Sequence, residues 1–209
     1  MNFSAASSRP EIPFSQELLR KATHLGALVI PASYYALELG KGVTLSVLIP
    51  ISVLIFLLDV GRIRNWWIWK NAGARLIGRM IRVHEAGGDF TGATYILLSA
   101  ACTIALYDKP IAVAALAFII VGDSCAAIVG RLYGRHRFGR KSVEGSLGCL
   151  AGCLVVAVFT PQLQWQIAVP GAVIATVVEA LSTRIDDNIS VPLVTGLGMT
   201  LVQKLLIPG

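Results

Sequence analysis

The chain has 209 residues, of which 55% are hydrophobic and 14% are charged, whereas a typical soluble domain carries about 25% charged residues. Together with a mean hydropathy of +0.70, this composition excludes an ordinary water-soluble domain and indicates an integral membrane protein. The net charge of +6 does not call for nucleic acid as a partner, because the cations sort to one side of the predicted membrane. We expect one domain over residues 1–209.

Seven apolar stretches predict an all-α bundle of about seven membrane-spanning helices. Loops on the cytoplasmic side of a membrane are enriched in Lys and Arg. With a cytoplasmic N-terminus, only Lys41, Lys109 and Lys204 of the 18 Lys and Arg residues fall on the outer side. We therefore predict a multi-pass membrane protein with its N-terminus in the cytoplasm. The stretches lie near residues 25–39, 43–60, 91–106, 110–130, 146–160, 166–180 and 189–207.

Two segments on the predicted cytoplasmic side have a helical pattern of their own. Residues 1–22 indicate an N-terminal cytoplasmic helix. Around its end, four polar residues share one helical face: Glu17, Arg20, Lys21 and His24. Residues 61–90 indicate an amphipathic helix lying in the headgroup region. An alternative for this segment is an aromatic anchor without a catalytic part. Its aromatic and basic residues are Trp66, Trp67, Trp69, Arg75, Arg79 and Arg82.

Asp123 is an acidic residue inside the fourth apolar stretch. Inserting such a residue into a membrane costs roughly 2.5 to 3.5 kcal/mol, so its presence indicates a function. Gly122, Ala126 and Gly130 lie on either side of it, and small residues of this kind permit close packing of helices. The alternative is structural, with Asp123 paired to an arginine to hold the bundle together.

The basic loop over residues 131–145 combines cations with glycines and hydroxyls, which together suit a polyphosphate. A loop that is basic only because it is cytoplasmic is the alternative. We predict a nucleotide-binding role for its last part and for the residue after it, namely Arg140, Lys141, Ser142, Glu144, Gly145 and Ser146.

Acidic residues also gather where the sixth stretch ends. Glu179, Asp186, Asp187 and Asn188 offer the hard oxygen ligands that Mg²⁺ prefers. Alternatively, Asn188 caps the seventh helix and one aspartate is a solvated charge. With Asp123 added, these five residues are the predicted ligands of a divalent metal. Asp123, Glu179 and Asp187 are also the predicted catalytic residues of a phosphoryl transfer, in which a carboxylate accepts the proton of an attacking hydroxyl.

Several motifs together resemble the CTP-dependent lipid kinases, a family that includes dolichol kinase, phytol kinase and the yeast-type diacylglycerol kinase. The resemblance implies an all-helical membrane fold, CTP as phosphoryl donor and a divalent metal. We further expect Arg20, Lys21 and His24 to close the nucleotide site. The motifs are Glu17 to His24, Asp59 with Arg62, Glu85 with Thr91-Gly92, Gly122-Asp123 with Ala126 and Gly130, Lys141 to Ser146, and Glu179 with Asp186 to Asn188 and Pro192.

Two other functions compete with a lipid kinase. The chain is more distantly similar to CDP-diacylglycerol synthases, which are CTP-dependent cytidylyltransferases, but their signature near the C-terminus is not matched. An ion-coupled transporter explains acidic residues inside spans, yet not their gathering with cations on one side. The expected partners are membrane lipids, a lipid alcohol (polyprenol, phytol or diacylglycerol) and a nucleoside triphosphate. The choice of donor among CTP, UTP and ATP and the oligomeric state stay open at this point.

Overall fold

The structure is a computed structural model that describes residues 21–64, 66, 89–139, 141–160, 162–182 and 186–206. Its regular elements are helices except for one short hairpin, which confirms the predicted all-α class. Residues 21–26 are helical as well. In chain order the elements are α2 (Val29–Ala36), α3 (Lys41–Ile63), α5 (Gly92–Leu106), α6 (Lys109–Tyr133), β1 (Arg137–Phe138), β2 (Lys141–Ser142), α7 (Val143–Val158), α8 (Trp165–Leu181) and α9 (Asp187–Leu206).

Each predicted apolar stretch contains a helix, but the helices differ in length. Three of those described, α3, α6 and α9, are long and apolar enough to cross a membrane, while α5, α7 and α8 are shorter apolar helices. The first stretch is divided, because residues 27–28 form a turn between residues 21–26 and α2. Pro31 contributes to this break, since it has no N–H to donate to the carbonyl of Ala27.

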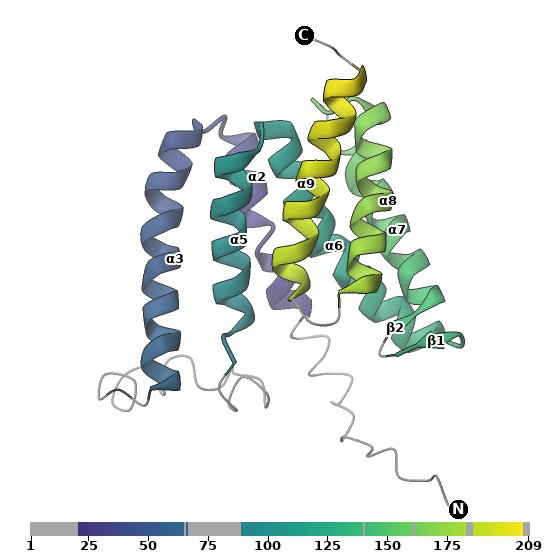
Figure 1. The fold of residues 1–209 in the computed structure, drawn as a ribbon, viewed down its shortest axis with the longest axis horizontal. Helices are drawn as coiled ribbons and strands as arrows, with labels where there is room; N and C mark the ends of the chain where they lie inside the picture. Colours follow the sequence, from purple (N-terminus) through teal and green to yellow (C-terminus); the bar gives the residue numbers. More distant parts are fainter. Residues whose placement is uncertain are drawn as a thin grey trace, which may run out of the picture.

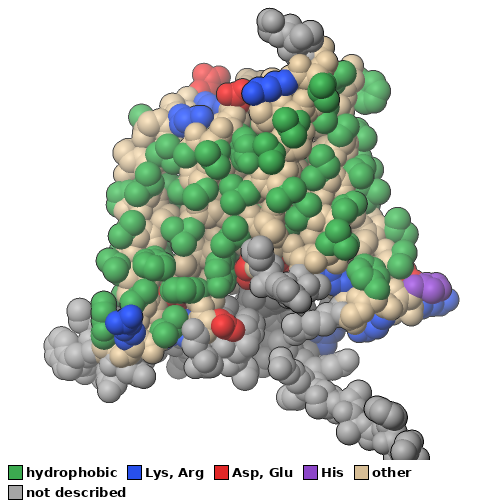
Figure 2. Space-filling view, in the orientation of Figure 1, with side chains coloured by type: hydrophobic (Ala, Val, Ile, Leu, Met, Phe, Trp, Pro, Cys, Tyr) green, Lys and Arg blue, Asp and Glu red, His purple; other side chains and the backbone are tan. Residues whose placement is uncertain are grey.

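Consecutive helices run in opposite directions through the bundle (Figure 1). The C-terminal ends of α3, α6 and α8 therefore lie at the same end as the N-terminal ends of α5, α7 and α9. We call this the basic end, because it carries Arg62, Arg131 and Lys141. The opposite end carries Lys41, Lys109 and Lys204. Hydrophobic side chains cover the belt between the two ends, and charged side chains gather toward them (Figure 2).

Helix α6 is the centre of the bundle, and residues 111–120 are all buried. Its contact with α7 is close because glycines leave no room for a side chain. A Cβ atom at Gly122 would lie 2.8 Å from Sγ of Cys153, and one at Gly152 would lie 2.8 Å from Sγ of Cys125. Small residues therefore bring the two backbones together, as the sequence predicted for Gly122.

The predicted basic loop contains more regular structure than a loop. Residues 131–133 continue α6, and β1 pairs antiparallel with β2 through Arg137 with Ser142 and Phe138 with Lys141. Gly139 forms the turn at φ +62°, a conformation that favours glycine. The predicted N-terminal helix up to residue 20 lies outside the described residues, and so do residue 65 and residues 67–88 of the predicted interfacial segment 61–90. Residues 61–63 of that segment belong to α3 instead.

Candidate active site

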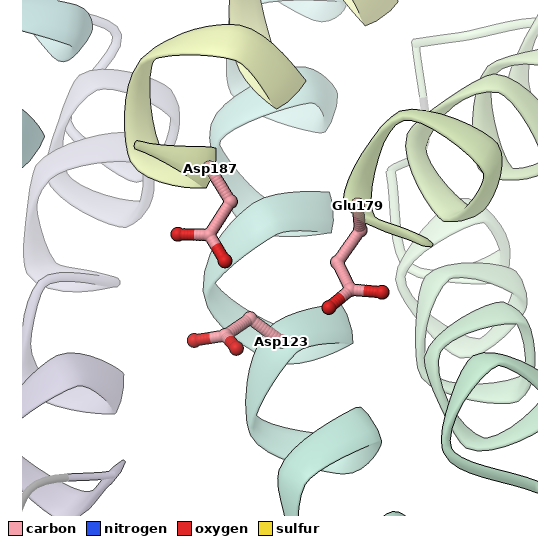
Figure 3. A group of neighbouring side chains, drawn as sticks. All are labelled: Asp123, Glu179 and Asp187. Atoms are coloured by element: carbon pink, nitrogen blue, oxygen red, sulfur yellow. The ribbon is translucent and has the colours of Figure 1, made fainter. Parts of the chain in front are cut away.

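Three carboxylates from three helices meet toward the basic end of the bundle. Asp123 lies on α6, Glu179 lies in the last turn of α8, and Asp187 is the first residue of α9. One carboxylate oxygen of each lies within 4.8 Å of the others, and the side chains point toward a common centre (Figure 3). The short connection from α8 to α9 brings Glu179 and Asp187 together, and α6 supplies the third group from the centre of the bundle.

Two lysines neutralise part of this charge. Nζ of Lys21 forms an ion pair with Oδ2 of Asp123, and these side chains are 4% and 18% exposed. Nε2 of His24 lies 3.6 Å from the same oxygen. Nζ of Lys141 lies 2.6 Å from Oε1 of Glu179 and also donates to its backbone carbonyl. Among the described residues, Lys21 is thus an ion-pair partner of Asp123.

Asp187 has no ion-pair partner in the part of the chain that the structure describes. Within the described residues, three carboxylates face two lysines, which leaves an excess of negative charge in a place largely shielded from water. Hard oxygen donors with excess negative charge are the ligand set that Mg²⁺ accepts. The residues present thus fit a divalent cation.

Asp186 and Asn188 interact with each other beside this cluster. Oδ1 of Asp186 accepts hydrogen bonds from the backbone N of Asn188 at 3.0 Å and from its Nδ2 at 2.7 Å. The first of these bonds satisfies an amide at the start of α9, as a helix cap does. Asn188 is buried, and its Oδ1 has no hydrogen-bond partner among the described residues.

The basic loop divides into residues that shape it and residues that reach the cluster. Oγ of Ser142 is the N-cap of α7 and accepts from the backbone N of Gly145 at 3.1 Å. Glu144 accepts from the backbone N of Arg135 at 3.1 Å and lies 2.7 Å from Nδ1 of His136. These contacts hold the hairpin against α7.

Lys141 of this loop contacts the carboxylate cluster through Glu179. Oγ of Ser146 is buried without a hydrogen-bond partner in the described part of the chain. Arg140 and Arg20, both predicted to bind the nucleotide, lie outside the described residues.

A second buried carboxylate, Asp59 on α3, was present in the sequence only as part of the family resemblance. Its Oδ2 accepts from the backbone N of Thr91 at 2.8 Å and from Oγ1 of Thr94 at 2.6 Å. Its Oδ1 lies 3.1 Å from Nε of Arg62. These bonds join the end of α3 to the start of α5. The signal in the sequence was an acid and a base three residues apart in an apolar helix.

Comparison with known proteins gives relatives of one kind. The chain is 24% identical over 216 residues to "CTP-dependent diacylglycerol kinase 1" of Saccharomyces cerevisiae, covering 90% of this chain and 74% of the yeast protein. It is 25% identical over 173 residues to the protein of the same name in Eremothecium gossypii, covering 69% of this chain and 54% of that protein. It is 35% identical over 106 residues to "Probable phytol kinase 1, chloroplastic" of Glycine max, covering 42% of this chain and 35% of that protein. The chain resembles CTP-dependent lipid kinases.

The resemblance predicted from the motifs is thus confirmed at the level of the family. No protein-family model matches the chain, and no solved structure matches it. The likeness to these lipid kinases is therefore carried by sequence.

Proposed function

We propose that this protein is a lipid kinase that transfers the γ-phosphoryl group of CTP to the hydroxyl of a membrane lipid alcohol. Diacylglycerol, phytol and polyprenols are the acceptors we consider. The observation that carries the proposal is the meeting of Asp123, Glu179 and Asp187 with Lys21 and Lys141 at one end of an apolar bundle. The names of the relatives support the same reaction.

The carboxylate cluster would hold Mg²⁺, with Asp123 and Glu179 as the carboxylates that supply oxygen ligands. The bound ion would neutralise charge on the triphosphate. Lys21 and Lys141 already contact carboxylate oxygens, and phosphate oxygens are equally good acceptors for their ammonium groups. Ser146, whose hydroxyl has no hydrogen-bond partner within the described ranges, is a further donor for a phosphate. These residues bind and orient the donor.

In the reaction, the hydroxyl oxygen of the lipid bonds to the γ-phosphorus while the bond from that phosphorus to the β–γ bridging oxygen breaks. The nucleoside diphosphate leaves, and the hydroxyl proton passes to a carboxylate. Mg²⁺ usually takes only one or two protein carboxylates, so one of the three remains for this step. We assign it to Asp187, which has no lysine partner among the described residues.

The proposed orientation places this site on the cytoplasmic side. We propose seven crossings with the N-terminus in the cytoplasm, because Lys and Arg gather at the basic end. A triphosphate in the hydrocarbon layer would lose its hydration without compensation. The site lies toward the basic end, where a water-soluble donor and the headgroup hydroxyl of a lipid can meet.

The test is transfer from radiolabelled CTP to lipid alcohols by the purified protein in lipid nanodiscs. A kinase places label from the γ-phosphate on the lipid and loses activity when EDTA removes divalent metal. Asp123→Asn should lower the rate by at least about 100-fold, which exceeds the loss typical for residues outside the metal-binding shell. Asp108→Asn is the matched control, since Asp108 is exposed at the opposite end of the same helix.

Two results would contradict the proposal. Label from the α-phosphate on the lipid would show a cytidylyltransferase. Absence of transfer from CTP, UTP and ATP to any of the lipid alcohols, together with ion-driven flux in proteoliposomes, would show a transporter.

A further inference from the structure

The pair formed by Asp186 and Asn188 leaves one polar atom unused. Asn188 is 6% exposed, and its Oδ1 is buried without a hydrogen-bond partner among the described residues. Nearly all buried polar atoms of native proteins are hydrogen-bonded, so an exception calls for an explanation such as a bound ion. The amide oxygen of Asn188 therefore indicates a ligand.

Asp186 determines which atom of the Asn188 amide is left over. A carboxylate only accepts hydrogen bonds, whereas the two ends of an amide differ, the NH₂ donating and the oxygen accepting. The end of Asn188 that faces Oδ1 of Asp186 at 2.7 Å must therefore be Nδ2. Oδ1, on the other branch of the amide, is directed away from Asp186. A reversed amide would place two acceptors against each other.

The buried position of Asn188 places it on the inner side of α9. It belongs to the same buried stripe as Met199. Met199 packs in the same buried core as Phe118 of α6, and α9 packs against both α6 and α8, so this stripe faces the interior of the bundle. Asp123 lies on α6, one and a half turns from Phe118 toward the basic end. Asn188 therefore lies on the interior side of α9, next in the chain to Asp187 of the carboxylate cluster.

We propose that Oδ1 of Asn188 is an additional oxygen ligand of a divalent cation held by the carboxylate cluster, and that Asp186 is a positioning residue that aims it. This inference rests on the metal site of the proposed function. The sequence predicted both residues as metal ligands. The structure distinguishes them, because Oδ1 of Asp186 already accepts hydrogen bonds from the backbone N and the Nδ2 of Asn188. Residues that orient a metal ligand typically contribute 10- to 100-fold to metal affinity.

The test measures Mn²⁺ binding to the purified protein without nucleotide or lipid alcohol, from the electron paramagnetic resonance signal of free Mn²⁺. We expect Asn188→Ala and Asp186→Ala each to weaken binding by about 10- to 100-fold. The double variant should bind no more weakly than the weaker single variant, because Asp186 acts through Asn188. Asp186→Asn should bind nearly as well as the unsubstituted protein, since its amide oxygen accepts the same hydrogen bonds and still caps α9.

Three results would overturn the inference. In the first, Asp186→Asn weakens Mn²⁺ binding as much as Asp123→Asn, which removes a proposed ligand. Asp186 would then be a ligand itself. The two alanine substitutions could have additive effects. The unsubstituted protein could bind no Mn²⁺. Asp186→Asn retains the cap of α9, so it distinguishes a ligand from a positioning residue even where the alanine variants fail to fold. Asp108→Asn is the control, which should leave Mn²⁺ binding unchanged.

The kinase assay is read separately from this titration. A protein that shows the expected Mn²⁺ pattern but transfers no phosphoryl group would refute the proposed reaction and leave the roles of Asp186 and Asn188 standing.

Discussion

Replacing Lys21 by methionine should destabilise the protein in a way that a divalent cation reverses. Methionine keeps the length of the apolar stem and removes the charge that faces Asp123. In the unsubstituted protein three carboxylates face two lysines. After Lys21→Met, Lys141 is the lysine that still faces them among the described residues, so the cluster loses one compensating positive charge.

The size of the effect follows from the burial of the pair. The side chains of Lys21 and Asp123 are 4% and 18% exposed, and removing one partner of a buried ion pair costs about 3–5 kcal/mol. For a chain of this size 1 kcal/mol corresponds to about 2–4 °C in unfolding temperature. The midpoint measured in EDTA should therefore fall by about 6–20 °C. Millimolar Mg²⁺ should recover much of this loss, because a bound cation supplies the missing positive charge.

The assay is thermal unfolding in detergent, followed by intrinsic fluorescence, with and without EDTA. Lys204→Met is the matched control, because Lys204 is exposed in the last turn of α9 at the opposite end. An unchanged midpoint for Lys21→Met in EDTA would refute the reasoning. So would an equal loss in the control, which would show that the effect does not come from the ion pair.

Two further substitutions test the packing of the fold. Gly122→Ala should destabilise the protein by about 1–3 kcal/mol, because the added methyl lies 2.8 Å from Sγ of Cys153. Gly42→Ala is the control, because a Cβ atom there has nothing within 4 Å, and it should leave the stability unchanged. Equal unfolding midpoints for the two variants would contradict this prediction. Asp59→Asn should cost about 3–5 kcal/mol, because it removes the buried carboxylate charge that faces Nε of Arg62. A free energy of unfolding within about 0.5 kcal/mol of the unsubstituted protein, a change usual for surface sites, would show that this network contributes little.

The helices were predictable because their signal is local. An apolar stretch near residues 110–130 predicted a helix that the structure places at Lys109–Tyr133, and an acid inside it marked the site. The division of the first stretch was missed. Its apolar run is continuous, and the hydropathy pattern does not register that Pro31 lacks a donor.

The roles of single polar residues were harder to predict. Ser142 was expected at the nucleotide, and its contacts among the described residues are those of a helix cap. Asp186 and Asn188 were expected to act alike, and the structure makes one the acceptor and the other the donor of a hydrogen bond. Such roles depend on which atoms of neighbouring groups face each other, and residue type alone does not decide that.

The sequence by itself determined that the chain forms helices that are apolar along their length, with charged residues between them. Composition and periodicity are signals that act over a few turns of a helix. Only the tertiary structure decided that Lys21 pairs with Asp123, 102 residues away, and Lys141 with Glu179, 38 residues away. Contacts over such separations arise from how whole helices pack, and an acid in one helix carries no local mark of the cation that will neutralise it.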